Sequence, residues 1–221
     1  MIRFPTGFSP LPQEEYERLR PSLEQVSFDL GEVIYESGEH LDYVYFPTAI
    51  ISLLYLMEDG SSAEMGLTGN EGIVGIALFM GGGTMPKRAV VQSAGEAIRL
   101  KAKALQAEFA LGSKFQYLLL RYTQALITQI SQTAVCNRLH TVEERLARWL
   151  LMCHDRVALD NLLLTQEFIS HMLGTRRARV GTAAGKLQVA GLISFSRGHI
   201  TILNREKLED FACECYRTVK D

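Results

Sequence analysis

The apolar pattern of this chain changes once, near residue 102, and this change limits the folds that the chain can adopt. Residues 26–101 contain short β-branched and aromatic runs that glycines, Pro47 and Asp59-Gly60 interrupt. Such runs are typical of an antiparallel sandwich or barrel, and an Asp-Gly pair favours a hairpin turn. From Ala102 onward the apolar residues recur at helical spacing. The sequence therefore predicts an α+β protein in which strands come first and helices follow.

Length and composition place the chain among ordinary globular proteins. It has 221 residues, of which 47% are apolar and 22% charged, and its formal net charge is −2. This length accommodates one large domain or two small ones, and the composition argues against disorder. No apolar run is long enough to span a membrane, and the N-terminus lacks the pattern of a secretory signal. We therefore expect a cytoplasmic protein.

Residues 111–140 predict a long helix that is apolar on more than one side. One row of apolar residues follows the i, i+3, i+4 and i+7 spacing, and a second row contains Leu120, Ile127 and Ala134. Such a helix needs two partners, which we take to be its own β domain and a second copy of the helix. The alternative is a helix buried within one globule, but no later segment is long enough to wrap it. The residues expected at the dimer interface are Phe115, Leu119, Tyr122, Leu126, Ile130 and Thr133.

One stretch near the C-terminus has no acidic residue, although the chain as a whole is slightly acidic. Between Phe168 and Leu203 there is no Asp or Glu, whereas five basic residues occur: Arg176, Arg177, Arg179, Lys186 and Arg197. A basic run by itself is usually a solvated face. The complete absence of carboxylates, however, is what contact with a polyanion requires, because a carboxylate would repel the phosphates.

The same stretch has the pattern of a helix-turn-helix followed by a β wing. Thr165 fits the cap of a first helix, Gly174 the turn, and Val180 the core anchor of a second helix. Two short strands about Arg197-Gly198 then form the wing. The second helix has a strip of small residues, bordered by arginines, that suits a major groove: Ala178, Gly181, Thr182 and Gly185. The residues expected to contact DNA are Thr165, Thr175, Arg176, Arg177, Ala178, Arg179, Thr182, Arg197 and His199.

From about Val26 to its end, the chain resembles the CRP/FNR family of transcription regulators. The most specific match is LTQEFISHMLGTRRARVGTAAGKLQVAGLI followed by SFSRGHITIL. The resemblance implies a cyclic-nucleotide-binding-like antiparallel β-roll with a short N-terminal helix in residues 1–110. It implies a dimerisation helix in residues 111–140 and a winged helix-turn-helix in residues 141–221. Its further implications are a homodimer on a palindromic site in double-stranded DNA, and RNA polymerase as a partner.

The resemblance also shows where this chain departs from the sensors of the family. The cAMP-responsive members carry a Gly-Glu pair followed by Arg-Ser, whereas no Glu occurs here between Glu71 and Glu96. We therefore do not expect cAMP as the effector. The iron–sulfur members need an N-terminal cysteine cluster, whereas the first cysteine here is Cys136. An unidentified anionic effector would meet the residues at the family's phosphate site and its glycine loop: Lys87, Arg88, Gly82 and Gly83.

The second helix of the motif departs from the family as well. The family's common Glu falls at Ala178 and a common base-reading Arg at Thr182, while a preceding Arg is matched by Arg177. Ala178 and Thr182 can offer methyl contacts to thymine. The target sequence should therefore differ from the well-known sites of the family.

No catalytic residue, metal site or cofactor is expected from the sequence. The histidines are scattered without an HxH pair, and GxSxG, P-loop and HExxH motifs are absent, which disfavours a cupin-like metal enzyme. Cys136, Cys153, Cys213 and Cys215 show no CxxC spacing, so we expect idle thiols rather than metal ligands, with Cys213 and Cys215 as a disfavoured redox pair. A ligand-binding β-roll that has lost DNA binding is the other alternative. The acid-free stretch argues against it.

Overall fold

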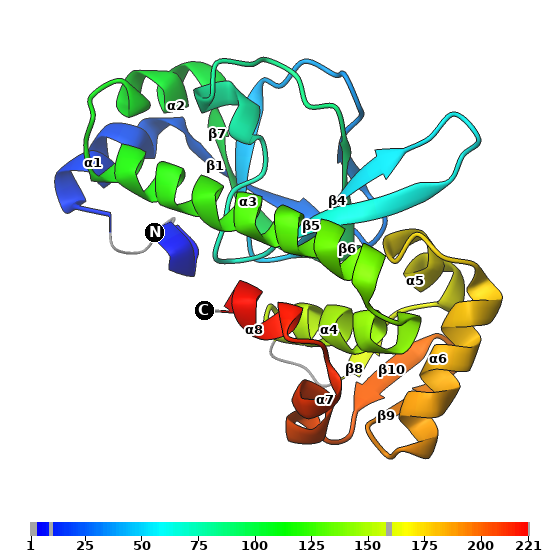
Figure 1. Cartoon of the computed structure of the whole chain (residues 1–221). Coiled ribbons are helices and arrows are strands. Elements are labelled where there is room, and N and C mark those ends of the chain that lie inside the picture. The colour runs from blue at the N-terminus through cyan, green and yellow to red at the C-terminus, as the bar shows by residue number, and fades with distance from the viewer. Residues whose placement is uncertain (1–3, 9–10, 158–160, 221) are drawn as a thin grey trace. The chain divides into compact units, whose positions relative to one another are not determined.

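The computed structural model describes residues 4–8, 11–157 and 161–220 (Figure 1). The chain divides into two compact units, Met1–Tyr55 with Leu67–Ile127, and Leu56–Gly66 with Thr128–Asp221. Antiparallel sheets come first, a long helix follows, and helix-turn-helix elements with a small sheet come last. The α+β fold class predicted from the sequence is confirmed. Within the described residues, no helix is long and apolar enough to cross a membrane.

The strands before residue 102 form two antiparallel sheets, with the orders β1-β7-β3 and β2-β6-β4-β5. In the first sheet, Leu100 lies opposite both Leu23 and Val44, so the buried side chains of neighbouring strands meet on one face. The elements are η1 (Thr6–Phe8), α1 (Gln13–Leu19), η2 (Arg20–Ser22), β1 (Leu23–Phe28), β2 (Val33–Tyr35), β3 (Tyr43–Pro47), β4 (Ile50–Leu56), β5 (Ser62–Thr68), η3 (Ile76–Phe79), β6 (Arg88–Ser93), β7 (Gly95–Lys101) and α2 (Ala102–Phe109).

An aromatic cluster fills part of the core of the first unit. Phe46 of β3 packs edge-on against Phe4 and Phe8, with ring centroids 4.7 and 4.8 Å apart. Phe115, at the start of α3 (Lys114–Leu139), completes the cluster and is fully buried. Edge-on pairs of this kind stabilise a core beyond the area that they bury. The cluster therefore joins the N-terminal segment, the sheet and the first turn of α3.

The first turn of α3 is held by a buried carboxylate. Glu15 of α1 accepts hydrogen bonds from the backbone N–H of Phe115 at 2.8 Å and of Lys114 at 3.2 Å, and from the Ser113 hydroxyl at 2.9 Å. The first N–H groups of a helix have no partner within the helix, and a negative charge is favourable there. Glu15 thus caps α3 from another element, and this contact fixes where the long helix begins.

The side of α3 that we expected at a dimer interface is largely buried by the chain itself. Of the expected residues, Tyr122 and Ile130 are half-buried and the remaining four are buried: Phe115, Leu119, Leu126 and Thr133. A side chain that its own chain covers cannot be the main contact of a partner, so the prediction of those four was wrong. The large apolar side chains that α3 exposes lie on other sides: Tyr117, Leu120, Ile127, Val135 and Leu139. Two of these, Leu120 and Ile127, belong to the second row that the sequence pattern contains.

The second unit contains a three-stranded antiparallel sheet in the order β8-β10-β9, together with five helices among the described residues. Thr141 and Glu144 form a capping box at the start of α4, in which each side chain bonds the backbone of the other. The elements after α3 are α4 (Val142–His154), β8 (Asn161–Leu163), α5 (Gln166–Met172), α6 (Arg177–Val189), β9 (Ile193–Ser196), β10 (His199–Ile202), α7 (Arg205–Phe211) and α8 (Cys215–Lys220).

The tip of the β4–β5 hairpin, residues 56–66, packs with the second unit. The indole N–H of Trp149 on α4 donates a hydrogen bond to Glu64 Oε1 at 3.0 Å, and both side chains are buried. Gly174, which follows α5, lies so close to the tip that a Cβ there would be 3.2 Å from the Cβ of Ala63. The tip therefore contributes to the surroundings of α4 and α5.

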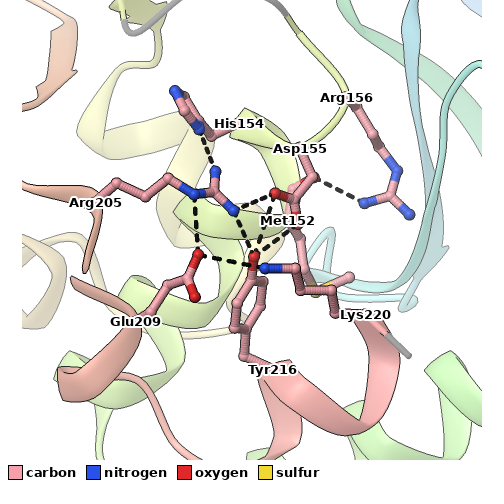
Figure 2. A network of polar contacts seen from close by, with 8 residues as sticks. All are labelled: Met152, His154, Asp155, Arg156, Arg205, Glu209, Tyr216 and Lys220. Atoms are coloured by element: carbon pink, nitrogen blue, oxygen red, sulfur yellow. Dashed lines mark hydrogen bonds and ion pairs between the residues drawn. The ribbon is translucent and has the colours of Figure 1, made fainter. Parts of the chain in front are cut away.

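A polar network centred on Arg205 holds the C-terminal helices in place (Figure 2). The Arg205 guanidinium donates to Asp155 Oδ1 at 2.5 Å, to the Tyr216 hydroxyl at 2.7 Å and to Glu209 Oε1 at 2.9 Å. The Tyr216 hydroxyl donates in turn to Asp155 Oδ2 at 2.9 Å, and Lys220 lies 3.5 Å from Glu209. Burial, followed by the hydrogen bond to Asp155, raises the pKa of Tyr216 and keeps the phenol neutral. The network links the end of α4 to α7 and α8.

We expect Glu15→Ala to destabilise the protein, because it leaves the N–H groups at the start of α3 without an acceptor in a buried place. The free energy of unfolding should fall by about 1–3 kcal/mol, and Glu15→Gln, which keeps one acceptor oxygen, should cost less. Urea unfolding followed by circular dichroism measures both. The control is Glu14→Ala, at an exposed neighbouring position. Equal stability of the Glu15→Ala and Glu14→Ala variants would contradict this account of how α3 begins.

Candidate nucleic-acid interface

Helices α5 and α6 and the turn between them form the motif that the sequence predicts. Thr165 Oγ1 accepts a hydrogen bond from the backbone N–H of Phe168 at 3.1 Å and caps α5. Gly174 has a φ of +55°, the left-handed conformation that commonly ends a helix. The N–H of the next residue, the half-buried Thr175, donates to the carbonyl of Ser170 at 3.0 Å. These local contacts close the turn and set the direction of α6.

One face of α6 packs into the second unit. The predicted anchor Val180 is fully buried, and so are the other apolar residues expected on this face, Ala183, Ala184 and Leu187. Gly181, which we expected on the exposed strip, is half-buried instead, because a Cβ there would be 3.4 Å from the side-chain nitrogen of Gln166 on α5. Gly181 therefore allows the two helices to come close together and is not part of the exposed surface.

The opposite face of α6 is exposed and positively charged. The side chains of Arg176, Arg177 and Arg179 are exposed, as are the small residues Ala178 and Thr182 between them. Thr182 Oγ1 donates to the backbone carbonyl of Ala178 at 3.1 Å, which leaves its methyl group at the surface. No ion pair joins these arginines to a carboxylate in the described part of the chain. Their charges are thus available to an anionic partner.

The β9–β10 turn places further basic residues beside the motif. Arg197 and Gly198 both have positive φ, at +50° and +81°, as the two central residues of a tight hairpin turn do. Arg197 and His199 are exposed. The wing tip, the start of α5 and the start of α6 together line a hollow of about 430 Å³, formed by Thr165, Gln166, Arg177, Phe195, Arg197 and Gly198.

Lys186 differs from the four arginines of the acid-free stretch. Its ammonium group forms an ion pair with Glu143 of α4. The pair lowers the pKa of Glu143, chiefly through the side-chain hydrogen bond. Lys186 therefore binds α6 to α4, and the basic surface consists of Arg176, Arg177, Arg179 and Arg197.

The structure separates the expected effector residues from one another. Arg88 makes a two-pronged contact with Glu36, at 2.6 and 2.8 Å, while Lys87 is buried, and burial lowers its pKa. Gly82 and Gly83 line a different pocket of about 500 Å³ that has two lysines in its wall. The whole lining is His40, Leu41, Asp42, Tyr43, Leu78, Gly82, Gly83, Lys101, Ala102, Lys103 and Gln106.

The side chain of Tyr122 fills the space beside Gly72. A Cβ at Gly72 would lie 2.3 Å from the Tyr122 ring, and the tyrosine hydroxyl is 2.7 Å from Thr68 Oγ1. Gly72 begins the segment that corresponds, by resemblance, to the phosphate-binding segment of the cAMP-responsive proteins. An aromatic ring of the chain itself therefore packs against the start of this segment.

Comparisons with known proteins agree with this geometry. A family model described as a Crp-like helix-turn-helix domain matches residues 144–211, which include α5, α6 and the wing. No match was found among curated protein sequences.

Several solved structures share the fold over most of the chain. FixK2 from Bradyrhizobium japonicum is 20% identical, with a TM-score of 0.74 over 86% of this chain and 98% of that one. A CRP-family transcriptional regulator from Thermus thermophilus is 19% identical, with a TM-score of 0.71 over 85% and 96%. The c-di-GMP-responsive regulator CLP from Xanthomonas campestris is 16% identical, with a TM-score of 0.69 over 87% and 100%.

At these identities the solved structures support the fold, while the family model supports the motif. The exposed arginines of α6 and the wing lie within the matched domain. The chain therefore carries a Crp-like helix-turn-helix domain on a CRP/FNR-type fold, the architecture of a DNA-binding transcription regulator.

Proposed function

We propose that this protein regulates transcription as a homodimer that binds a palindromic DNA site, with α6 of each chain in the major groove. The observation that carries the proposal is the face of α6, where exposed arginines border small residues and no carboxylate pairs with them in the described residues. A helix of this shape can lie deep in a groove, since only short side chains separate its backbone from the bases. The role is regulatory rather than catalytic.

The arginines have different roles in this proposal. Arg177 is the first residue of α6 and lies at the end that a recognition helix points toward the base edges. We assign it to a guanine, and we assign the methyl groups of Ala178 and Thr182 to thymines. Arg197, at the tip of the wing, and Arg176, at the cap of α6, reach only phosphates. Phosphate contacts position the protein, whereas base contacts specify the sequence.

We expect Arg177→Ala and Arg197→Ala to weaken DNA binding in different ways. Arg177→Ala should cost about 1–3 kcal/mol on the preferred site and reduce discrimination at one base pair of each half-site. Arg197→Ala should weaken binding to all sequences alike and lower the slope of log affinity against log salt by about 1. Fluorescence anisotropy on the preferred duplex and its single-base variants, at several salt concentrations, measures both effects.

Lys186→Ala is the matched control for these variants, since it removes a positive charge from the same helix but one that Glu143 already pairs. It should change affinity little. If Arg177→Ala keeps full base discrimination while Arg197→Ala loses it, then the wing and not the start of α6 reads the sequence.

The dimer interface that we propose is the exposed row of α3. Leu120, Ile127 and Ala134 recur every seven residues on an exposed side of the helix, as in one row of a coiled coil. About half of the Leu120 and Ile127 side chains is exposed, at 49% and 48%. Pairing with a second α3 would cover these side chains and bring two copies of α6 onto one duplex.

We expect the double variant Leu120→Glu, Ile127→Glu to be monomeric, because dimerisation would bury two carboxylates in each helix. Sedimentation velocity measures the association state. The control is Leu30→Glu, at an exposed apolar residue outside α3. A double variant that sediments as the parent does would place the interface elsewhere.

An effector other than cAMP is part of the proposal. The segment between Glu71 and Glu96 has no carboxylate for a ribose, and Tyr122 packs against its start. The pocket bordered by Gly82 and Gly83 contains Lys101 and Lys103 and so suits an anionic molecule. This assignment replaces Lys87 and Arg88, of which the first is buried and the second is paired with Glu36.

We expect titration calorimetry to show no cAMP binding at micromolar concentrations, because the groups that would hold the ribose and phosphate are missing. DNA affinity should likewise be the same with and without cAMP. Micromolar binding that also raises DNA affinity would contradict this part of the proposal while leaving the DNA interface unaffected.

A further inference from the structure

Three cysteines and one histidine from distant parts of the chain meet in the second unit. Cys136 and His140 lie four residues apart at the end of α3 and therefore on the same side of the helix. Cys213 and Cys215 lie between α7 and the first turn of α8. No metal site is expected from the sequence because neither pair has the usual spacing on its own. Folding brings the two pairs together.

The distances between the four side chains match those within a tetrahedral metal site. The three Sγ atoms and a ring nitrogen of His140 all lie within 4.8 Å of one another. Cys136 Sγ is 3.5 Å from Cys213 Sγ, and Cys215 Sγ is 3.6 Å from His140 Nδ1. Zinc–sulfur bonds of about 2.3 Å at tetrahedral angles separate two ligands by about 3.8 Å. Small side-chain movements would therefore place all four atoms around one ion.

The surroundings of the four side chains suit metal-bound thiolates. All three cysteines are buried, and the Gln132 amide donates to Cys215 Sγ at 3.0 Å. The other ring nitrogen of His140, Nε2, lies 3.3 Å from a carboxylate oxygen of Glu214. Metal-binding histidines commonly donate their second N–H to a carboxylate, which fixes the orientation of the ring. His140 is thus held with Nδ1 toward the cysteines.

A buried arginine supplies the charge that such a site would need. Three thiolates, one neutral imidazole and Zn²⁺ carry a net charge of −1. Arg148 of α4 is 5% exposed, and its charge interacts with Cys136. Its Nη2 donates to Thr133 Oγ1 at 3.2 Å, but Nε and Nη1 have no hydrogen-bond partner within the described residues. A buried guanidinium without a counter-charge is costly, and an anionic metal centre would offset that cost.

We propose that Cys136, His140, Cys213 and Cys215 bind one Zn²⁺ ion per chain. Three cysteines and one histidine are a composition of structural zinc sites, in which four protein ligands leave no position open for a substrate. The bound ion would join the end of α3 to the start of α8. It lies next to the connection from α3 to α4, so it holds in place the segment that precedes the DNA-binding motif.

The direct test is the metal content of the full-length protein, purified without chelators. Mass spectrometry of the metal should find one zinc per chain. Protein stripped of zinc and loaded with Co²⁺ should show the thiolate-to-cobalt absorption bands of a tetrahedral sulfur-rich site. Wild-type protein that is folded and holds no zinc, and that gives no such bands with Co²⁺, would overturn the proposal. So would a Cys136–Cys213 disulfide found by peptide mapping of freshly purified protein.

Single substitutions then assign the ligands. Cys136→Ser and Cys215→Ser should each reduce bound zinc from one per chain to a small fraction, and a chelator should lower the melting temperature of the wild type but not of these variants. The matched control is Cys153→Ser, which changes the remaining buried cysteine outside the cluster and should keep its zinc. Full zinc in both the Cys136→Ser and Cys215→Ser proteins would exclude these residues as ligands and overturn the proposal.

Discussion

Helix α3 depends on a buried carboxylate at its first turn, and much of the structure is arranged along this helix. Because Glu15 accepts the N–H groups at its start, the helix begins at one defined residue, and its register decides which side chains the chain buries. A shift of one residue would turn each side chain by about 100° around the axis. The same register leaves Leu120 and Ile127 exposed. The position of one cap therefore determines which row of α3 is available to a second chain.

The helix-turn-helix and the wing could be predicted because their signals are local. A cap at Thr165, a turn at Gly174 and an anchor at Val180 act within a few residues, and the structure confirms all three. The strands could be predicted for the same reason. Where a prediction needed to know which of two similar faces is covered, it was wrong. Phe115 and Leu119 are as apolar as Leu120 and Ile127, and only the fold distinguishes them.

Contacts between distant segments were beyond sequence reasoning. The helical pattern places Gly181 on an exposed strip, and only the packing of Gln166 from α5 against it shows otherwise. The charge of Lys186 belongs to the basic stretch of the sequence, but Glu143 of another helix pairs with it. The cysteines are the largest such case, since Cys136 and Cys213 are far apart in sequence and only 3.5 Å apart in space. Spacing rules find metal sites built from one segment and miss those that two segments build.

The C-terminal helix α8 is held at two places, and both bear on the DNA-binding motif. The Arg205 network fixes α8 to the end of α4, and the cysteine cluster places its first residue against the end of α3. Helix α4 also carries Glu143, which pairs with α6. The base-reading helix thus rests on a scaffold whose polar contacts are largely satisfied, as a surface that must present arginines in fixed positions requires.

The most direct test of the central claim, sequence-specific DNA binding through α6, is selection of binding sites from a random duplex library by the wild-type protein. The account predicts enrichment of a palindrome whose half-sites are separated by about one turn of DNA, roughly 10 base pairs between centres. Binding without enrichment of any sequence, or enrichment of a single site without symmetry, would contradict it.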